Sequence, residues 1–553
     1  MKINIIGGGP AGLYSAVLLK LQNPNAEIHV FERNSRDSTF GFGIVLSSET
    51  LGKLATADHV SAAAINVAFT YWDDLYVDFK GETLRSVGHG FSGLERLTLL
   101  QILGDRAEHL GVLCHWNSNL ADLDTLCAAD LVIAGDGVNS GVREKFASHF
   151  RPSVEMCKNR FVWLGCEKPL PGFTFMFKEN EHGVWIVHAY QFKKGRSTFV
   201  VETTPETFAR SGLAEQDEAA TASYVQALFK DELKGNNILT NRSNWRQFPK
   251  VHCEHWYHEN IVLIGDAAHT AHFSIGSGTK LALEDAISLA HSLKDGWNNV
   301  PAALAKYERD RRPRSERIQV AATISLEWFE NIQRHWHLPP LQFNFSLLTR
   351  SNQISYEKLK IRDAAFVEAV NKSIVGNESD CAEPASVGLN VGKIKLPNRI
   401  MAFDVTAEAS IGLFLISAVH GGCNVELMRH ELPCNPADQQ WPVLLAAAVT
   451  KTRQQVADSA EIGLRLPSTV AIETAVALVR AAKFTGCALV HIIHRPNFHP
   501  ALEPLILCEI LRGETGLPVL LSGVLETRDA INTAIAAGRV DLATLADHAL
   551  IKV

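Results

Sequence analysis

Three glycines near the start of the chain have the spacing of a turn that binds a dinucleotide. Gly7, Gly9 and Gly12 form G-x-G-x-x-G between an apolar run at residues 2–6 and a helical pattern at 11–22. The first glycine permits a tight turn, the second lets a pyrophosphate approach the backbone, and the third lets helix and strand pack closely. The helix adds free N–H groups and the positive end of its dipole. The motif predicts a bound dinucleotide, but by itself does not separate FAD from NAD.

An acidic residue stands where the ribose of such a cofactor would bind. The pattern EIHVFE at residues 27–32 predicts a second strand that ends in Glu32, roughly 20 residues after Gly12. With the preceding strand and helix it forms a βαβ opening. We expect Glu32 and the adjacent Arg33 to contact the cofactor.

A second motif, at residues 260–286, favours FAD. NIVLIGDAAHTAHFSIGSGTKLALEDA begins as an apolar strand that ends in Gly265 and Asp266, and it leads into an amphipathic helical pattern. A carboxylate at a strand end can bind the ribityl hydroxyls of FAD, and glycines let backbone N–H groups approach the flavin and its pyrophosphate. The residues that we expect to bind FAD here are Asp266, Gly276, Gly278 and Thr279.

A third motif repeats the strand, glycine turn and helix. It is DLVIAGDGVNSGVR, which contains Asp136, Gly137, Ser140 and Arg143. Arg96 opens another helical pattern in GFSGLERLTLLQIL. Alone, Arg96 would be an ordinary surface arginine. Its place before the third motif favours a role in the flavin pocket, together with Asp136 and Gly137.

Length and composition exclude several classes of protein. A chain of 553 residues predicts two or three domains. A net charge of -7 argues against a general nucleic-acid binder. Ten cysteines without a C-x-x-C pair predict free thiols, no zinc site and a reducing cytoplasm. The N-terminal apolar run is broken by glycines and a proline, and no run of about 18 apolar residues occurs, so we expect neither a signal peptide nor a membrane span.

The periodicity of apolar residues changes along the chain. Short β-rich runs from about 160 to 250 predict an antiparallel sheet inserted into the first domain, and 279–293 and 303–336 return to helical periodicity. A polar stretch at 376–390 is interpreted as a linker. The segment 391–553 alternates strand and helix patterns, which predicts a second α/β domain.

Together, the three motifs resemble those of the single-component, class A FAD aromatic monooxygenases of the para-hydroxybenzoate hydroxylase type, over residues 1–375. Segments 39–47, 265–286 and 325–351 look like the aryl-coenzyme A branch, the salicylyl-CoA 5-hydroxylase and 2-aminobenzoyl-CoA monooxygenase/reductase type. The wider family has a proline pair where this chain has His272 and Phe273, and in this replacement the chain resembles the aryl-coenzyme A branch.

The resemblance implies a fold and a reaction. The fold is a Rossmann-like FAD-binding domain with an inserted antiparallel substrate sheet. NADH or NADPH reduces the FAD, dioxygen adds to give a flavin C4a-hydroperoxide, and one oxygen atom hydroxylates or epoxidises the ring of an aryl thioester. We expect no membrane, nucleic-acid or metal partner. We expect a cytoplasmic protein that can form a homodimer. Two alternatives stay open: a free or carrier-protein-bound aromatic substrate, and a non-catalytic flavoprotein scaffold.

Two further predictions concern the substrate. His272 lies beside the flavin glycines, where it would hydrogen-bond the ring substituent or relay its proton; alternatively it only packs and bonds backbone. A run of arginines would bind the phosphates of coenzyme A, because guanidinium suits phosphate; alternatively it is a solvated helix face. The run is Arg309, Arg311, Arg312, Arg314 and Arg317.

The C-terminal segment resembles a shortened old-yellow-enzyme reductase barrel. Residues 393–405 look like the opening of such a barrel and 517–550 like its end. A complete barrel rarely has fewer than about 200 residues, so 391–553 predicts an incomplete TIM-barrel-like domain. Gly463 and Leu466 align with the pair that binds the substrate carbonyl in that family, and neither side chain donates a hydrogen bond. We therefore expect no FMN and no reductase activity.

Overall fold

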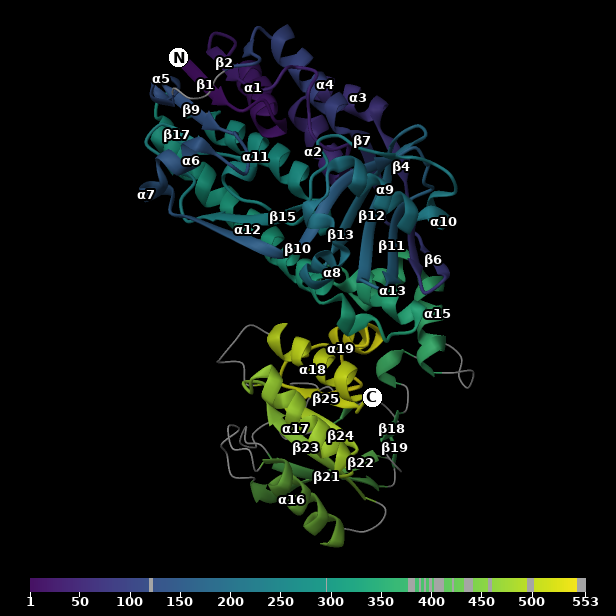
Figure 1. Ribbon diagram of the computed structural model, residues 1–553. Helices are drawn as coiled ribbons and strands as arrows, with labels where there is room; N and C mark the ends of the chain where they lie inside the picture. The colour runs from purple at the N-terminus through teal and green to yellow at the C-terminus, as the bar shows by residue number, and fades with distance from the viewer. Residues whose placement is uncertain are drawn as a thin grey trace. The chain divides into compact units, whose positions relative to one another are not determined.

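The chain forms two compact units, Met1–Glu330 and Asn331–Val553 (Figure 1). The computed structural model describes residues 1–118, 123–294, 296–375, 383–386, 389–391, 394–396, 400–401, 412–419, 422–431, 441–455, 460–494 and 502–544. Most of the predicted linker at 376–390 lies outside these residues. Helices α13 (Pro340–Thr349), α14 (Tyr356–Arg362) and α15 (Ala364–Val375) group with the second unit, although the sequence assigned them to the first domain.

The first unit is built around a six-stranded, mainly parallel sheet. Its order is β16 (Tyr257–His258), β17 (Ile261–Leu263), β9 (Leu131–Ala134), β1 (Lys2–Ile6), β2 (Glu27–Phe31) and β8 (Leu113–His115). The strands β9 and β17 are buried throughout, as expected for a parallel sheet that is covered on both faces. Helix α1 (Pro10–Gln22) packs against α4 (Arg96–His109) and α11 (Gly278–Leu293). The expected βαβ opening is therefore present.

A second, mainly antiparallel sheet occupies the middle of this unit. Its order is β14 (Ile238–Leu239), β10 (Pro152–Cys166), β13 (Arg196–Thr203), β12 (Gly183–Lys193), β11 (Phe173–Asn180), β5 (Leu75–Phe79) and β6 (Glu82–Ser86), and β15 (Arg246–Cys253) also pairs with β10. The strands β5 and β6 come from before the third motif, and β5 runs parallel to β11. Helices α8 (Pro205–Ser211) and α9 (Glu218–Leu228) contribute to the core on one face of the sheet.

Smaller elements complete the first unit. A three-stranded sheet has the order β3 (Gly43–Ser47), β7 (Phe91–Glu95), β4 (Thr70–Trp72). The helices outside the sheets are α2 (Ser48–Ala57), α3 (His59–Ala68), α5 (Leu123–Cys127), α6 (Gly141–Lys145), α7 (Ala147–Phe150), α10 (Lys230–Leu233) and α12 (Val300–Glu330), with 3-10 turns η1 (Leu213–Glu215), η2 (Gly265–Ala267) and η3 (Phe273–Ile275).

The second unit contains a seven-stranded sheet. Its order is β20 (Ile400–Met401), β26 (Leu542–Thr544), β25 (Val519–Ser522), β24 (Leu489–Ile493), β23 (Ala460–Pro467), β21 (Gly412–Val419) and β22 (Gly422–Glu431). The first five strands run parallel, whereas β21 and β22 are antiparallel. Among the described strands no pairing joins β20 to β22. The barrel-like character of this domain stays a prediction.

The remaining elements of the second unit are short strands and helices. They are η4 (Ile332–His335), η5 (Pro384–Ser386), β18 (Leu389–Val391), β19 (Ile394–Leu396), α16 (Trp441–Gln455), α17 (Ile472–Phe484), α18 (Leu502–Thr515) and α19 (Arg528–Ala536). No helix in the described ranges of either unit is long and apolar enough to cross a membrane.

Candidate cofactor and substrate site

The turn between β1 and α1 has the geometry that its glycines predict. Gly7 has a φ of 106°, and a Cβ there would lie 2.3 Å from the carbonyl oxygen of Gly135. A Cβ on Gly12 would lie 2.0 Å from the oxygen of Gly7, which shows how closely helix and strand pack. A Cβ on Gly9 would meet nothing within 4 Å. The second glycine therefore faces open space in front of the helix N-terminus, as a pyrophosphate requires.

Glu32 is held in place beside this turn. Its Oε2 accepts a hydrogen bond of 2.8 Å from the backbone N–H of Gly8, and its Oε1 accepts one of 2.8 Å from the N–H of Asn34. The next residue, Arg33, is exposed. These contacts fix the carboxylate at the end of β2, where the sequence predicts the ribose.

Asp266 and Arg96 are close enough to influence each other electrostatically, although 170 positions separate them in the chain. Burial raises the pKa of Asp266, and the charge of Arg96 opposes this rise. Asp266 is nevertheless exposed to solvent. A residue that is both surrounded by protein atoms and exposed to solvent lies in a recess of the surface. The Arg96 guanidinium lies over the ring of Phe40 and donates to the Thr39 hydroxyl at 3.1 Å.

Arg143, in the third motif, joins this motif to the second. Its buried guanidinium donates to the backbone oxygens of Ala267 at 3.0 Å and Val138 at 2.5 Å. In the same turn, burial raises the pKa of Asp136, whose Oδ2 accepts from the N–H of Val142 at 3.3 Å. A Cβ on Gly137 would meet nothing within 4 Å, so this turn also borders open space.

The glycines after Asp266 lead into a helix whose N-terminus has no side-chain cap. Gly276 has a φ of 64° and ends η3, and a Cβ on Gly278 would meet nothing within 4 Å. The neighbouring Ser277 hydroxyl is buried without a hydrogen-bond partner in the described structure. Thr279 follows in the first turn of α11. Open glycines, a helix N-terminus and a carboxylate together fit a dinucleotide with a polyhydroxyl chain, as FAD has.

A buried charge network that the motifs did not reveal supports this turn. Asp285, on α11, accepts hydrogen bonds from the N–H of Gly265 at 2.8 Å and from His269 Nε2 at 2.9 Å. Its other oxygen accepts from Arg311 Nε at 2.7 Å. Burial alone would raise the pKa of Asp285, but the charges of His269 and Arg311 bring it below its ordinary value. The only sequence signal was the acidic pair in LALEDA.

The arginine run at 309–317 does not form one patch. Arg311 is buried and also pairs with Glu284 at 3.1 Å, so its guanidinium serves the network around Asp285. Arg309 pairs with Asp310, and Arg312 pairs with Glu308 and Glu316. Arg317 is exposed and donates to the oxygen of Pro313. Two members of the run, Arg311 and Arg314, line one groove.

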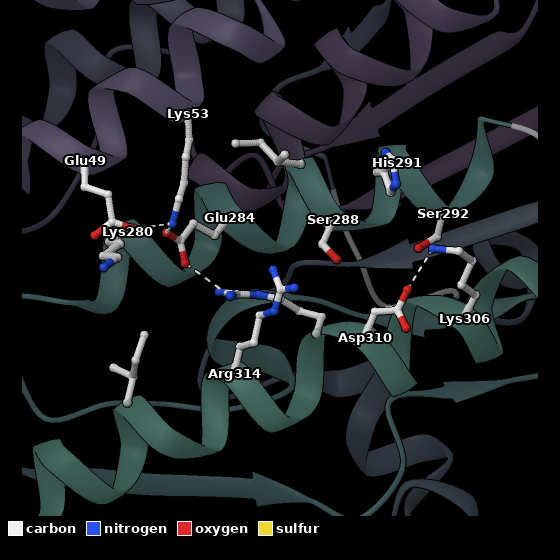
Figure 2. A pocket seen from close by; sticks show the side chains of 13 residues that line it. Glu49, Lys53, Lys280, Glu284, Ser288, His291, Ser292, Lys306, Asp310 and Arg314 are labelled. Carbon is white, nitrogen blue, oxygen red and sulfur yellow. Dashed lines mark hydrogen bonds and ion pairs between the residues drawn. The ribbon is translucent and has the colours of Figure 1, made fainter.

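That groove runs along α11, between α2 and α12, and has a volume of about 510 Å³. Figure 2 shows Lys53 and Lys280 toward one end, Lys306 toward the other and Arg314 between them. Five cationic and three anionic side chains line it, namely Lys53, Lys280, Lys306, Arg311 and Arg314 against Glu49, Glu284 and Asp310. On a chain of net charge -7 this groove is locally positive.

Aromatic side chains cover one face of the antiparallel sheet. Along β12, Trp185, Val187 and Ala189 belong to the core with α8 and α9. The alternate residues His188 and Tyr190 therefore lie on the other face. There the Tyr190 hydroxyl donates to the oxygen of Gly43 at 2.7 Å. Rings on this side include Phe161, Phe175, Phe273 and Phe329. This face meets η3, directly before Gly276, and forms a candidate aromatic-ring site.

His272 lies at the junction of the two sites. It is buried, its ring contacts Phe248 and Phe273, and its Nδ1 accepts a hydrogen bond of 3.3 Å from the N–H of Ser274. Such a bond leaves the proton on Nε2. His272 thus packs against neighbouring rings and bonds the backbone, as the alternative prediction states. A role of His272 toward a substrate stays a prediction. The described residues contain no cluster that suggests a metal site.

Comparison with known proteins gives a consistent result. Residues 101–322 match the FAD binding domain family. The chain is 41% identical over 409 residues to salicyloyl-CoA 5-hydroxylase of Streptomyces sp, covering 72% of this chain and 78% of that protein. It is 34% identical over 367 residues to 3-hydroxy-4-methyl-anthranilyl-[aryl-carrier protein] 5-monooxygenase of Streptosporangium sibiricum, covering 66% and 99%. A crystal structure of a 2-methyl-3-hydroxypyridine-5-carboxylic acid oxygenase variant shares the fold, with a TM-score of 0.52, 18% identity and coverage of 66% and 96%.

The chain belongs to the FAD-dependent aromatic monooxygenases. It is therefore an enzyme rather than a flavoprotein scaffold, and its cofactor is FAD, with NADH or NADPH as the reductant typical of the family.

Proposed function

We propose that this enzyme hydroxylates or epoxidises the aromatic ring of an acyl thioester of coenzyme A. The observation that carries the proposal is the 41% identity, over 409 residues, to a hydroxylase that is named for a salicyloyl-CoA substrate. The aromatic face of the antiparallel sheet is suited to enclose such a ring, and the basic groove along α11 is suited to phosphate.

Residues from all three motifs would hold FAD. The set is Gly7, Gly9, Gly12, Glu32, Arg33, Arg96, Asp136, Gly137, Asp266, Gly276, Gly278 and Thr279. Open space at Gly9, Gly137 and Gly278 supports this assignment. When bound, FAD supplies, with the reductant and dioxygen, the transfer of one oxygen atom to an electron-rich ring carbon. The protein positions the ring and keeps water away from it.

The aromatic face would hold the substrate ring. Phe161, Phe175, Phe273 and Phe329 offer apolar contacts and the edge-to-face geometries that aromatic pairs prefer. His272, with Nε2 carrying the proton, would donate a hydrogen bond to a ring substituent. The ring is buried and packs against Phe248 and Phe273.

For the coenzyme A phosphates we propose the groove, with Arg314 as the contributing member of the arginine run. Arg314 is exposed, and Lys53 and Lys306, 43% and 41% exposed, pair only with carboxylates at the groove itself. Such surface ion pairs contribute little stability, so phosphates can compete for the lysines. The groove begins at Lys280, two residues after Gly278, and so extends away from the flavin turn.

A carrier-protein thioester is the second candidate. The relative that is named for an aryl-carrier-protein substrate matches this chain over 99% of its own length. We also propose an enzyme domain at residues 1–375, a linker at 376–390 and a degenerate old-yellow-enzyme-like domain at 391–553. The 367-residue length of this match is close to that of the proposed enzyme domain.

One substrate panel separates these candidates. Product formation and NADH or NADPH oxidation would be measured with salicylyl-CoA, 2-aminobenzoyl-CoA, the same acyl groups on a carrier protein, and the free acids. We expect hydroxylated product from a coenzyme A ester and little from the free acid. Turnover of the carrier-bound ring alone would favour the second candidate, and turnover of only the free acids would exclude both thioesters.

A further inference from the structure

A buried histidine is hydrogen-bonded to a buried glutamate on the aromatic face of the antiparallel sheet. His188 Nε2, on β12, and Glu202 Oε2, on β13, are 2.9 Å apart, and the two side chains are 4% and 0% exposed. Asn159, on β10, donates from Nδ2 to Glu202 Oε1 at 2.8 Å. Both carboxylate oxygens are therefore hydrogen-bonded, by side chains from two neighbouring strands.

The pair belongs to the substrate side of the sheet. The His188 ring lies against Phe175, Phe273 and Phe329, with centroids 5.1, 5.3 and 4.8 Å away. These rings come from β11, from η3 just before the flavin glycines, and from the end of α12. On the opposite face, Val187 and Ala189 pack toward α8 and α9.

A buried carboxylate with a polar partner is costly, because hydrophobic residues of similar volume are often as stable or more stable. Here the pair occupies two buried positions on a face where His188 contacts Phe175, Phe273 and Phe329. Burial alone would raise the pKa of Glu202, but the hydrogen bond and charge of His188, with His272 and Asn159, bring it below its ordinary value. The Glu202 carboxylate is thus ionised and can stabilise a neighbouring positive charge.

Building on the proposed function, we propose that His188, oriented by Glu202 and Asn159, accepts the proton of a hydroxyl group on the substrate ring. Because Nε2 faces the carboxylate, that nitrogen carries hydrogen and Nδ1 is the acceptor. The O–H bond breaks, its electron pair stays on the oxygen, and the proton moves to the imidazole. Glu202 stabilises the imidazolium, and the proton leaves to water after turnover. A phenolate makes the ring carbon para to it more electron-rich.

Three substitutions test this role. His188→Gln keeps a donor toward Glu202 but cannot hold a proton near neutral pH, and Glu202→Gln removes the charge while retaining an acceptor. Because breaking a buried pair destabilises proteins, Arg106→Gln is the matched control. It breaks the half-buried pair between Arg106 and Asp58, 3.1 Å apart, in α4 and before α3. Melting temperature and FAD content are measured for all three.

Two readouts separate proton transfer from structure. The first is the ultraviolet difference spectrum of a bound phenolic aryl-CoA without reductant, which reports phenol and phenolate across pH. The second is product formed per NADH or NADPH oxidised, with the pH profile of kcat. Other titrating groups near the pair are His272, Glu330 and Cys157, so the His188→Gln profile is compared directly with wild type.

We expect His188→Gln to suppress the bound phenolate near neutral pH and to lower the product-forming rate by on the order of a hundredfold. Glu202→Gln should do the same to a smaller extent, and Arg106→Gln should lower only the melting temperature. The His188 and Glu202 variants could show the melting temperature of the control but the same ligand ionisation, and the same product formed per NADH or NADPH oxidised, as wild type. In that case the pair is structural and the inference is wrong. Failure of the wild type to bind or turn over any aryl-CoA would instead overturn the proposed function.

Discussion

The Asp285 carboxylate accepts a hydrogen bond of 2.8 Å from the backbone N–H of Gly265, twenty positions earlier in the chain. Gly265 has a φ of 59° and directly precedes Asp266. Asp285 lies about two turns into α11, the helix that starts at Gly278. Its side chain thus fixes the strand end that presents Asp266, the carboxylate that we propose to bind the ribityl chain.

Replacing Asp285 should destabilise the first unit and make it less sensitive to acid. Asp285→Asn removes one of the two carboxylates that pair with the buried Arg311 and leaves Glu284. Removing a partner from a buried ion pair typically costs about 3–5 kcal/mol, and the remaining pair with Glu284 reduces this cost. Since the pKa of Asp285 is lowered by folding, its stabilisation is present above about pH 4, the unfolded value, and is lost as pH falls through the folded value. Urea unfolding from pH 7 to pH 3 checks this: the difference from wild type should shrink toward low pH.

Two glycines of the first turn should respond differently to alanine. Gly9→Ala fits the apoprotein, because the new methyl group meets nothing within 4 Å and φ is -75°, but it occupies the space proposed for the pyrophosphate. Gly12→Ala would place a methyl group 2.0 Å from the Gly7 oxygen. We expect Gly9→Ala to melt like wild-type apoprotein and to lose FAD, and Gly12→Ala to unfold at a lower temperature. FAD retention by Gly9→Ala would contradict the proposed position of the cofactor.

Asp266→Ala should weaken FAD retention without unfolding the protein. The carboxylate is accessible and would bind the ribityl hydroxyls, and a hydrogen bond to a charged group contributes about 1.5–3 kcal/mol. Equilibrium dialysis should show an FAD dissociation constant raised on the order of tenfold to a hundredfold. Asp231→Ala, on α10 in the substrate sheet region, is the exposed-aspartate control and should bind FAD normally.

The groove predicts a charge-dependent KM. Arg314→Glu and Lys280→Glu should raise the KM for an aryl-CoA on the order of tenfold and leave that for the corresponding free acid unchanged. Arg309→Glu reverses the charge of an exposed arginine of the same run that does not line the groove, so it should leave both values unchanged. Equal effects of all three would indicate general electrostatic attraction, not a phosphate site.

The C-terminal domain should contain no FMN. At the positions expected to bind a carbonyl, Leu466 is buried, and a Cβ on Gly463 would lie 2.2 Å from the Phe414 ring. Flavin extraction and chromatography should give one FAD and no FMN per chain, and the product ring should be oxygenated but not further reduced. Stoichiometric FMN would show that the domain has kept or gained a flavin site.

The motifs predicted the local geometry of the flavin turns well, because a glycine turn between a strand and a helix is determined by residues close in sequence. The antiparallel sheet was also anticipated from its period-two runs. The inclusion of β5 and β6 was not, since strand pairing depends on distant partners. The arginine run was read as one surface, yet Arg311 points to Asp285, because the face of a helix that is buried depends on what packs against it. The sequence did not predict the contact between His269 and Asp285 for the same reason.

The contacts of Arg143 determine which positions in these turns can change over evolutionary time. It binds the backbone oxygens of Val138 and Ala267, and every amino acid presents a backbone oxygen. Residues 138 and 267 can therefore vary in type while the two turns stay tied together, whereas residue 143 can hardly vary, since few side chains reach several oxygens at once. The tie between the motifs would thus persist among relatives whose turn sequences have diverged.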